Sequence, residues 1–293
     1  KNVEISFLFL LMIIAITIIT IILLFIFRKN PKYKKKIEDS KANLSKHFNR
    51  YLKNISPKVY SSKLKTTTNN SNTFKNQYLS KLRQIPENKR KFLINYTKTA
   101  NTYLTSAGLK NLIKIPTNYV MSIDKLEMRM PYTLDNIIVL PQNFLNRINN
   151  KIDKTILETL IHEKLHIIQR LYQDKFNNFY KRFYSFLDNV IRLENLPRVI
   201  KDKSMTNPDN NFDLWLYKLN GKTYIPSLEI TKNGLKEFAY EYKNYNNKIL
   251  LKNILKYSNT SQTHPNELFA YEVSEQIIAN KLNGKVKQFL NLI

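Results

Sequence analysis

The chain has 293 residues, which is long enough for one catalytic-size domain with a sizeable core. Its 48 basic and 22 acidic residues give a formal net charge of +26, a field that favours anionic surfaces such as phospholipid headgroups. No recognisable nucleic-acid module accompanies this charge, so no specific nucleic-acid partner is expected. The absence of cysteine excludes disulfides, thiolate metal ligands and a cysteine nucleophile.

The N-terminal segment Ile5–Phe27 is an uncharged apolar stretch of 23 residues. As a helix it spans the roughly 30 Å core of a bilayer, and it is longer than the apolar region of a cleavable signal peptide. The sequence therefore predicts a transmembrane anchor over residues 1–27. The basic run Arg28–Lys36 follows directly, so the positive-inside rule predicts a single-pass protein whose C-terminal domain lies on the cytoplasmic side. The same run is suited to contact with anionic lipid.

Residues 28–75 are basic and polar and end in a Thr- and Asn-rich tract, a composition that resists forming a packed core. We interpret them as a linker or stalk with some helix around Ile37–Leu52. The folded domain is then expected over residues 76–293. Its first predicted helix is Glu87–Leu104, where apolar residues recur at helical spacing after Pro86.

The middle of the chain combines strand and helix signals. Residues Tyr132–Leu140 predict one strand, and a short helix is expected around Asn143–Ile148. A long helical pattern then runs from Lys154 to about Ile191.

The last third begins with a hairpin signal. Asn220-Gly221 lies between two strand-like runs, and a type I′ turn needs the positive φ that these residue types adopt easily. Residues 235–255 fit strand or helix equally well. A final helix is predicted over Pro265–Leu282, with Pro265 in its first turn and Gly284 just past its end.

The sequence His162-Glu163-Lys164-Leu165-His166 matches the metal-binding pattern HExxH. Because His162 and His166 are four residues apart, a helix places both imidazoles on one face, within reach of one metal ion. Glu163 is placed to act on a water molecule at that metal. The chain has only four histidines, which argues against a chance pair, although two structural histidines on a core helix remain the alternative.

A catalytic zinc site needs a third protein ligand, and Glu267 is the best candidate. It follows His166 by 101 residues. As a structural alternative, Glu267 would only be a favourable carboxylate in the first turn of a helix. Glu272 and Glu275 on the same predicted helix stay open as ligands. His264 is a further ligand, an oxyanion donor or a loop residue, and the loop interpretation has the most weight.

The chain has 18 tyrosines, too many for the sequence to single out an oxyanion donor. Tyr224 and Tyr271 are weak candidates for that role.

The HExxH helix and the later run Asn266-Glu267-Leu268-Phe269-Ala270 together resemble the zincin superfamily of metallopeptidases, especially its gluzincin-like families. In those families a second helix with a similar run carries a glutamate ligand. The segment Met130–Pro141 is similar to the zincin edge strand that holds substrate by strand addition. The resemblance covers residues 126–169 and 264–275. Lys164 is charged where related peptidases usually carry an uncharged residue.

The resemblance implies an α+β, helix-rich zincin-like domain with a small mixed sheet, preceded by one N-terminal transmembrane helix. It implies a membrane-anchored zinc metallopeptidase with Zn²⁺ bound by His162, His166 and Glu267, acting on a protein or peptide substrate. Glu163 would be the general base for a zinc-activated water. Composition and architecture are typical of a large DNA virus or an AT-rich microbe. The alternative is a catalytically inactive zincin-fold structural protein of a virion or membrane assembly.

Overall fold

The chain divides into two compact units, residues 1–43 and 44–293, and the computed structural model describes most of the second. The predicted membrane segment Ile5–Phe27 and the basic run Arg28–Lys36 lie outside the described residues. In the described part, no helix is both long enough and apolar enough to cross a bilayer. The described residues are 49, 51–52, 55, 57–64, 68, 70–123, 126–184, 187–192, 195–205, 207–209, 213–231, 234–253 and 264–293.

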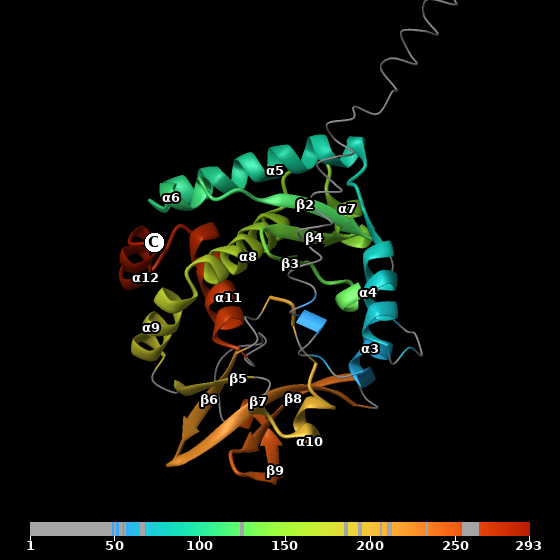
Figure 1. Cartoon of the computed structure of the whole chain (residues 1–293). Coiled ribbons are helices and arrows are strands. Elements are labelled where there is room, and N and C mark those ends of the chain that lie inside the picture. Colours follow the sequence, from blue (N-terminus) through green and yellow to red (C-terminus); the bar gives the residue numbers. More distant parts are fainter. Residues whose placement is uncertain are drawn as a thin grey trace, which may run out of the picture. The chain divides into compact units, whose positions relative to one another are not determined.

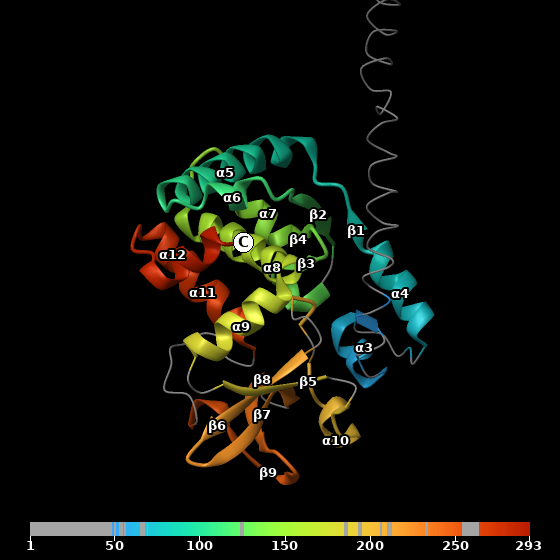
Figure 2. The same cartoon turned by 60° about the vertical axis from the view of Figure 1, so that its left-hand side comes forward.

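A four-stranded mixed sheet with the order β1-β2-β4-β3 lies between two groups of helices (Figures 1 and 2). In this sheet β2 and β4 are parallel, and the other neighbours are antiparallel. β4 is buried on both faces because Ile138 and Leu140 join one hydrophobic core while Ile137 and Val139 join another. The strands are β1 (Leu82–Arg83), β2 (Asn118–Ser122), β3 (Tyr132–Leu134) and β4 (Ile137–Pro141).

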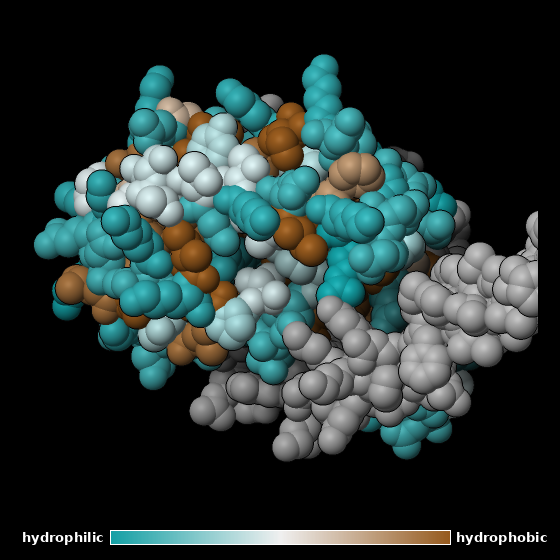
Figure 3. Space-filling view, turned by 90° about the horizontal axis from the view of Figure 1, so that it is seen from above, coloured by the Kyte–Doolittle hydropathy of each residue, from teal (hydrophilic) through white to brown (hydrophobic). Residues whose placement is uncertain are grey.

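The larger core lies between one face of this sheet and a layer of helices. The predicted helix Glu87–Leu104 is confirmed as α5 (Glu87–Ser106), which turns Leu93, Tyr96, Ala100 and Leu104 inward at helical spacing. The outward face of α5 is polar, and Figure 3, seen from this side, shows mainly hydrophilic residues with small hydrophobic areas between them. The other helices of this layer are α6 (Lys110–Ile113), α7 (Gln142–Arg147), α8 (Lys154–Leu171), α9 (Gln173–Phe183), α11 (Pro265–Ile278) and α12 (Gly284–Asn291).

The opposite face of the sheet is covered by residues that the sequence placed in a linker. Tyr51, Tyr60 and Phe74 are buried there, together with Tyr78, next to Ile137 of β4. The prediction of a linker over 28–75 is therefore wrong for its described part from Tyr51 onward. The prediction relied on the polar average composition of the segment, whereas its few aromatic residues form the packing contacts. The helices on this face are α3 (Pro57–Leu64) and α4 (Ser71–Ser80), and Asn70 caps the start of α4.

Two predicted elements are divided in the structure. The single strand predicted over Tyr132–Leu140 is a hairpin of β3 and β4, because Asp135 adopts φ 55° and reverses the chain. The long helix predicted from Lys154 to Ile191 stops at Tyr172, whose φ of −122° and ψ of 37° are not helical. α9 follows, and Leu187–Arg192 then forms strand β5.

The segment between α8 and α11 includes a second sheet, an antiparallel meander with the order β5-β6-β7-β8-β9. The predicted hairpin is confirmed as β6 (Asp213–Leu219) and β7 (Lys222–Thr231), with Asn220 at φ 48° and Gly221 at φ 77°. The ambiguous region 235–255 supplies β8 (Gly234–Glu241) and β9 (Asn244–Leu250), followed by a short 3₁₀ turn, η3 (Leu251–Asn253).

This second sheet packs on the main core through one face. Trp215 and Tyr217 of β6 are buried in the main core, and the Trp215 ring lies edge-on to Tyr180 of α9 at 5.9 Å. The alternate residues Leu216, Ile225 and Tyr240 face the other way, towards Ile200 of the short helix α10 (Arg198–Lys201).

The final predicted helix exists as α11 but ends earlier than expected. It stops at Ile278, and Asn280 adopts φ 52° two residues later. Gly284, predicted to follow a helix end, instead opens α12 behind the cap residue Asn283. With two sheets and layered helices, the described chain has a mixed α+β fold, as predicted.

Candidate metal site

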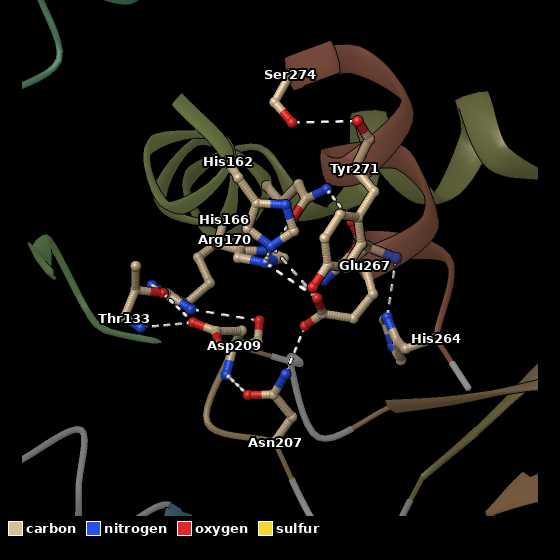
Figure 4. A network of polar contacts seen from close by, with 12 residues as sticks. Thr133, His162, His166, Arg170, Asn207, Asp209, His264, Glu267, Tyr271 and Ser274 are labelled. Atoms are coloured by element: carbon tan, nitrogen blue, oxygen red, sulfur yellow. Dashed lines mark hydrogen bonds and ion pairs between the residues drawn. The ribbon is translucent and has the colours of Figure 1, made fainter. Parts of the chain in front are cut away.

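Helices α8 and α11 pack against each other and bring three candidate ligands together (Figure 4). His162 and His166 project from one face of α8, and Glu267 projects from the first turn of α11. Their ligand atoms all lie within 4.8 Å of one another, and all three residues are buried. This group could hold a metal ion.

The distances suit tetrahedral coordination. With metal–ligand bonds of about 2.0–2.1 Å, two ligand atoms at the tetrahedral angle lie roughly 3.3–3.5 Å apart. Oε2 of Glu267 lies 3.4 Å from Nε2 of His162 and 3.5 Å from Nε2 of His166. The two Nε2 atoms are 2.9 Å apart, slightly closer than that spacing. The three atoms thus form one face of a tetrahedron.

A buried amide fixes the orientation of the His166 ring. Nδ1 of His166 lies 2.7 Å from Oε1 of Gln169. The amide nitrogen of Gln169 donates to the Tyr180 hydroxyl and to the Asn266 carbonyl, both at 2.9 Å, so its oxygen must face the imidazole. Nδ1 of His166 therefore donates to Gln169, and Nε2 is the ring nitrogen that faces the metal position.

The other histidine is positioned by packing. The Tyr271 ring lies against the His162 ring, with centroids 4.3 Å apart. Nδ1 of His162 is buried and has no hydrogen-bond partner among the described residues. Burial, followed by the charge of His166, lowers the pKa of His162. A low pKa favours the neutral imidazole that binds metals.

Glu267 is held as a carboxylate between the histidines and an amide. Burial opposes its charge, but His166 and His162 outweigh burial and hold the pKa of Glu267 below its usual range. Its second oxygen, Oε1, accepts a hydrogen bond of 2.5 Å from Nδ2 of Asn207. The two carboxylate oxygens therefore have different partners.

Further carboxyl groups lie close to the three candidate ligands. Glu163 and Asp209 are each 3 % exposed, and with Glu267 they bring three buried carboxyl groups to one place, beside the guanidinium of Arg170 and the imidazole of His166. Burial and then Asp209 raise the pKa of Glu163 well above its usual value. Burial also raises the pKa of Asp209. These raised pKa values favour the neutral carboxyl groups, and a cation bound nearby would favour their carboxylate forms.

The strand expected to hold substrate is present at the sheet edge but is partly occupied. β3 lies last in the order β1-β2-β4-β3 and contacts α8. The backbone N–H of Thr133 in β3 donates to Oδ1 of Asp209 at 2.6 Å, and its hydroxyl donates to the same oxygen at 2.5 Å. A peptide that paired with β3 at Thr133 would have to displace Asp209.

The remaining candidates take structural positions. His264 is the N-cap of α11, where Nδ1 accepts the N–H of Asn266 at 3.0 Å, in agreement with the loop interpretation. Glu272 accepts a hydrogen bond from the Tyr184 hydroxyl at 2.8 Å, and Glu275 is exposed. Tyr224 lies in the second sheet, paired with Tyr217. Of the two tyrosines considered, only Tyr271 lies beside the ligands.

Lys164 does not contribute its charge to the site. Its ammonium donates to the Ile115 carbonyl at 3.0 Å and lies 3.4 Å from the Thr117 hydroxyl, in the connection between α6 and β2. Burial lowers the pKa of Lys164 to about 8.

We therefore expect Lys164→Met to retain full zinc content, because the lost hydrogen bonds lie away from the ligands. The cost in unfolding free energy should be about 1–3 kcal/mol. Metal analysis and urea unfolding of the purified variant test this. A loss of zinc would show that Lys164 supports the metal site after all.

The sequence did not predict four residues that form hydrogen bonds around the candidate ligands: Gln169, Arg170, Asn207 and Asp209. Gln169 had a usable signal, since it lies one helical turn after His166 and on the same face. Asn207 and Asp209 had none beyond the local turn pattern Asn-Pro-Asp, because their partners lie on α11 and β3.

Comparison of the chain with protein-family models, with curated proteins and with solved structures finds no match. The interpretation of the site therefore rests on its geometry.

Proposed function

We propose that this chain is a zinc-dependent metallopeptidase of the zincin type that hydrolyses protein or peptide substrates. The observation that carries the proposal is the convergence of His162, His166 and Glu267 on one point, with the Glu163 carboxyl beside them. The histidines precede the glutamate in the chain, and an edge strand lies against the histidine helix. This order supports the resemblance to gluzincins.

The donor set fits zinc. Two imidazoles and one carboxylate are typical ligands of catalytic zinc, which keeps its fourth position open for water or substrate. Oε2 of Glu163 is buried and has no hydrogen-bond partner among the described residues, so it is free to accept a proton. Bound zinc would supply Lewis acidity, which polarises a carbonyl and lowers the pKa of water to about 7.

The residues of the chain then have distinct roles. His162, His166 and Glu267 would hold the ion, while the Glu163 carboxylate takes a proton from the attacking water and passes it to the leaving amine. The pKa of Glu163 is raised because the group is buried beside other carboxyl groups. A cation bound nearby would lower this pKa and favour the carboxylate form. The proposal retains the membrane anchor Ile5–Phe27 and a cytoplasmic catalytic domain.

The second candidate is a catalytically inactive structural protein of a virion or membrane assembly. The contact between Thr133 and Asp209 favours it, because this contact occupies the strand edge where a substrate would pair. The two candidates differ in turnover, and metal content alone does not separate them.

Metal removal and restoration test the proposal. The full chain, purified in detergent, should contain about one zinc per molecule, and His166→Ala should contain almost none because two ligands hold zinc poorly. A chelator should abolish hydrolysis of a set of quenched fluorescent peptides, and added zinc should restore it. Stoichiometric zinc without hydrolysis would favour the structural candidate, while absence of zinc from the wild-type protein would refute the metal site.

A further inference from the structure

We propose that Asn207 is a positioning residue that determines which oxygen of Glu267 faces the metal. The inference rests on the proposed metal site and extends it to the segment between the two ligand helices. Nothing in the HExxH pattern or in the run around Glu267 points to this residue.

The first observation is the asymmetry of the Glu267 carboxylate. The terminal torsion of glutamate is broad, so an unrestrained side chain could present either oxygen or both to a metal ion. Asn207 donates to Oε1 at 2.5 Å, and Oε2 is the atom that lies 3.4 and 3.5 Å from the two imidazole nitrogens. The amide thus leaves one oxygen for the ion.

The second observation is that the Asn207 amide is itself fixed. Its oxygen accepts the backbone N–H of Asp209 at 3.0 Å, and this bond turns the amino group towards Glu267. The oxygen and the nitrogen of the Asn207 amide therefore each have a partner, and together these two hydrogen bonds determine its orientation.

The third observation is the anchoring of Asp209. Its carboxylate accepts two hydrogen bonds from Thr133 of β3, and its backbone carbonyl accepts one from Arg170 of α8 at 3.3 Å. Arg170 also donates to the carbonyl of Asp135 at 2.9 Å. Figure 4 shows Asp209 and Asn207 beside each other below Glu267. A continuous set of contacts thus joins the histidine helix to the glutamate helix through residues 207–209.

These contacts matter because the two helices are far apart in the sequence. The positions of His162 and His166 follow from one helical turn, whereas Glu267 arrives 101 residues later on a separate helix. Partners of metal ligands typically contribute 10- to 100-fold to metal affinity by orienting them. Asn207 is suited to that role because an amide donor also favours the charged carboxylate.

Competition with a zinc chelator measures the effect. We expect Asn207→Ala in the full chain to bind zinc about 10- to 100-fold more weakly than the wild-type protein. The matched control is Asn247→Ala, since the exposed Asn247 donates to Glu241 of the second sheet at 2.7 Å and its loss should leave zinc affinity unchanged. If the alanine variant does not fold, Asn207→Ser replaces it, because serine keeps the turn bond to Asp209 but is too short to reach Glu267.

A double-mutant cycle separates positioning from a general structural role. In a Glu267→Ala background, Asn207→Ala should cause no further loss of zinc affinity, since the group on which it acts is gone. An equal loss in both backgrounds would overturn the inference, as would wild-type affinity in the single Asn207 variant. Both results would leave the metal site standing. A wild-type protein that binds no zinc would refute the metal site and the inference together.

Discussion

Glu163→Gln should retain about one zinc per chain and lose peptide hydrolysis by a factor of about 10² to 10⁴. Glutamine has the shape of glutamate but cannot take a proton from water. Glu163 is not one of the three residues whose ligand atoms converge on the metal position. Its replacement should therefore leave zinc binding nearly intact. Metal analysis and kcat/KM on the same preparation give both quantities.

The matched control is Glu275→Gln, because Glu275 is exposed on α11 and lies outside the converging group. Its zinc content and turnover should equal those of the wild-type protein. Thermal unfolding of both variants would show whether the fold is retained. Wild-type turnover in Glu163→Gln would exclude Glu163 as the general base, and hydrolysis would then need a different proton acceptor.

The second large effect is expected at a pair outside the candidate metal site, the ion pair of Lys63 and Glu127. The Lys63 ammonium donates to Oε2 of Glu127, and both side chains are almost completely buried. Oε1 of Glu127 accepts the hydroxyls of Tyr51 at 3.1 Å and Tyr78 at 3.2 Å. Lys63→Met would leave a carboxylate buried without its counter-ion and should destabilise the fold by about 3–5 kcal/mol.

Urea unfolding measures this loss of unfolding free energy, and two further variants serve as controls. Arg90→Ala removes a partly exposed ion pair with Glu87, 3.6 Å long, and should cost less than about 1 kcal/mol. The double variant Lys63→Met/Glu127→Leu should recover much of the stability, because an apolar pair of similar volume often replaces a buried ion pair without cost. A small effect of Lys63→Met alone would mean that water reaches the carboxylate.

This ion pair also explains an unusual backbone. Glu127, Met128 and Arg129 all have positive φ, at 43°, 58° and 64°, a conformation that non-glycine residues adopt at a cost. The partners of the Glu127 side chain hold this left-handed turn (within η1, Leu126–Arg129) directly before β3. The N-terminal helices therefore fix the start of the edge strand beside the candidate site.

Local patterns predicted the parts of the fold that depend on local interactions. Helical spacing located α5, and Asn220-Gly221 located the hairpin of β6 and β7. The two histidines could be placed on one face from their spacing alone, and the run around Glu267 marked the residue that reaches them across space.

The missed features depend on residues distant in sequence. Lys63 and Glu127 are 64 residues apart, and neither gives a local sign of its partner. β1 and β2 are short strands whose pairing joins distant segments, so periodicity could not reveal them. Asn207 and Asp209 likewise owe their places to β3, α8 and α11, which meet only in the folded chain.

The long separation between His166 and Glu267 has a consequence for protein synthesis. A ribosome that has added His166 must add another 101 residues before Glu267 exists, which takes roughly 5–20 s at typical elongation rates. During that interval only the two imidazoles are available, and any metal ion they capture remains weakly held. The candidate metal site is thus complete only when α11 packs on α8, and under the proposed function the growing polypeptide could not hydrolyse peptides before that point.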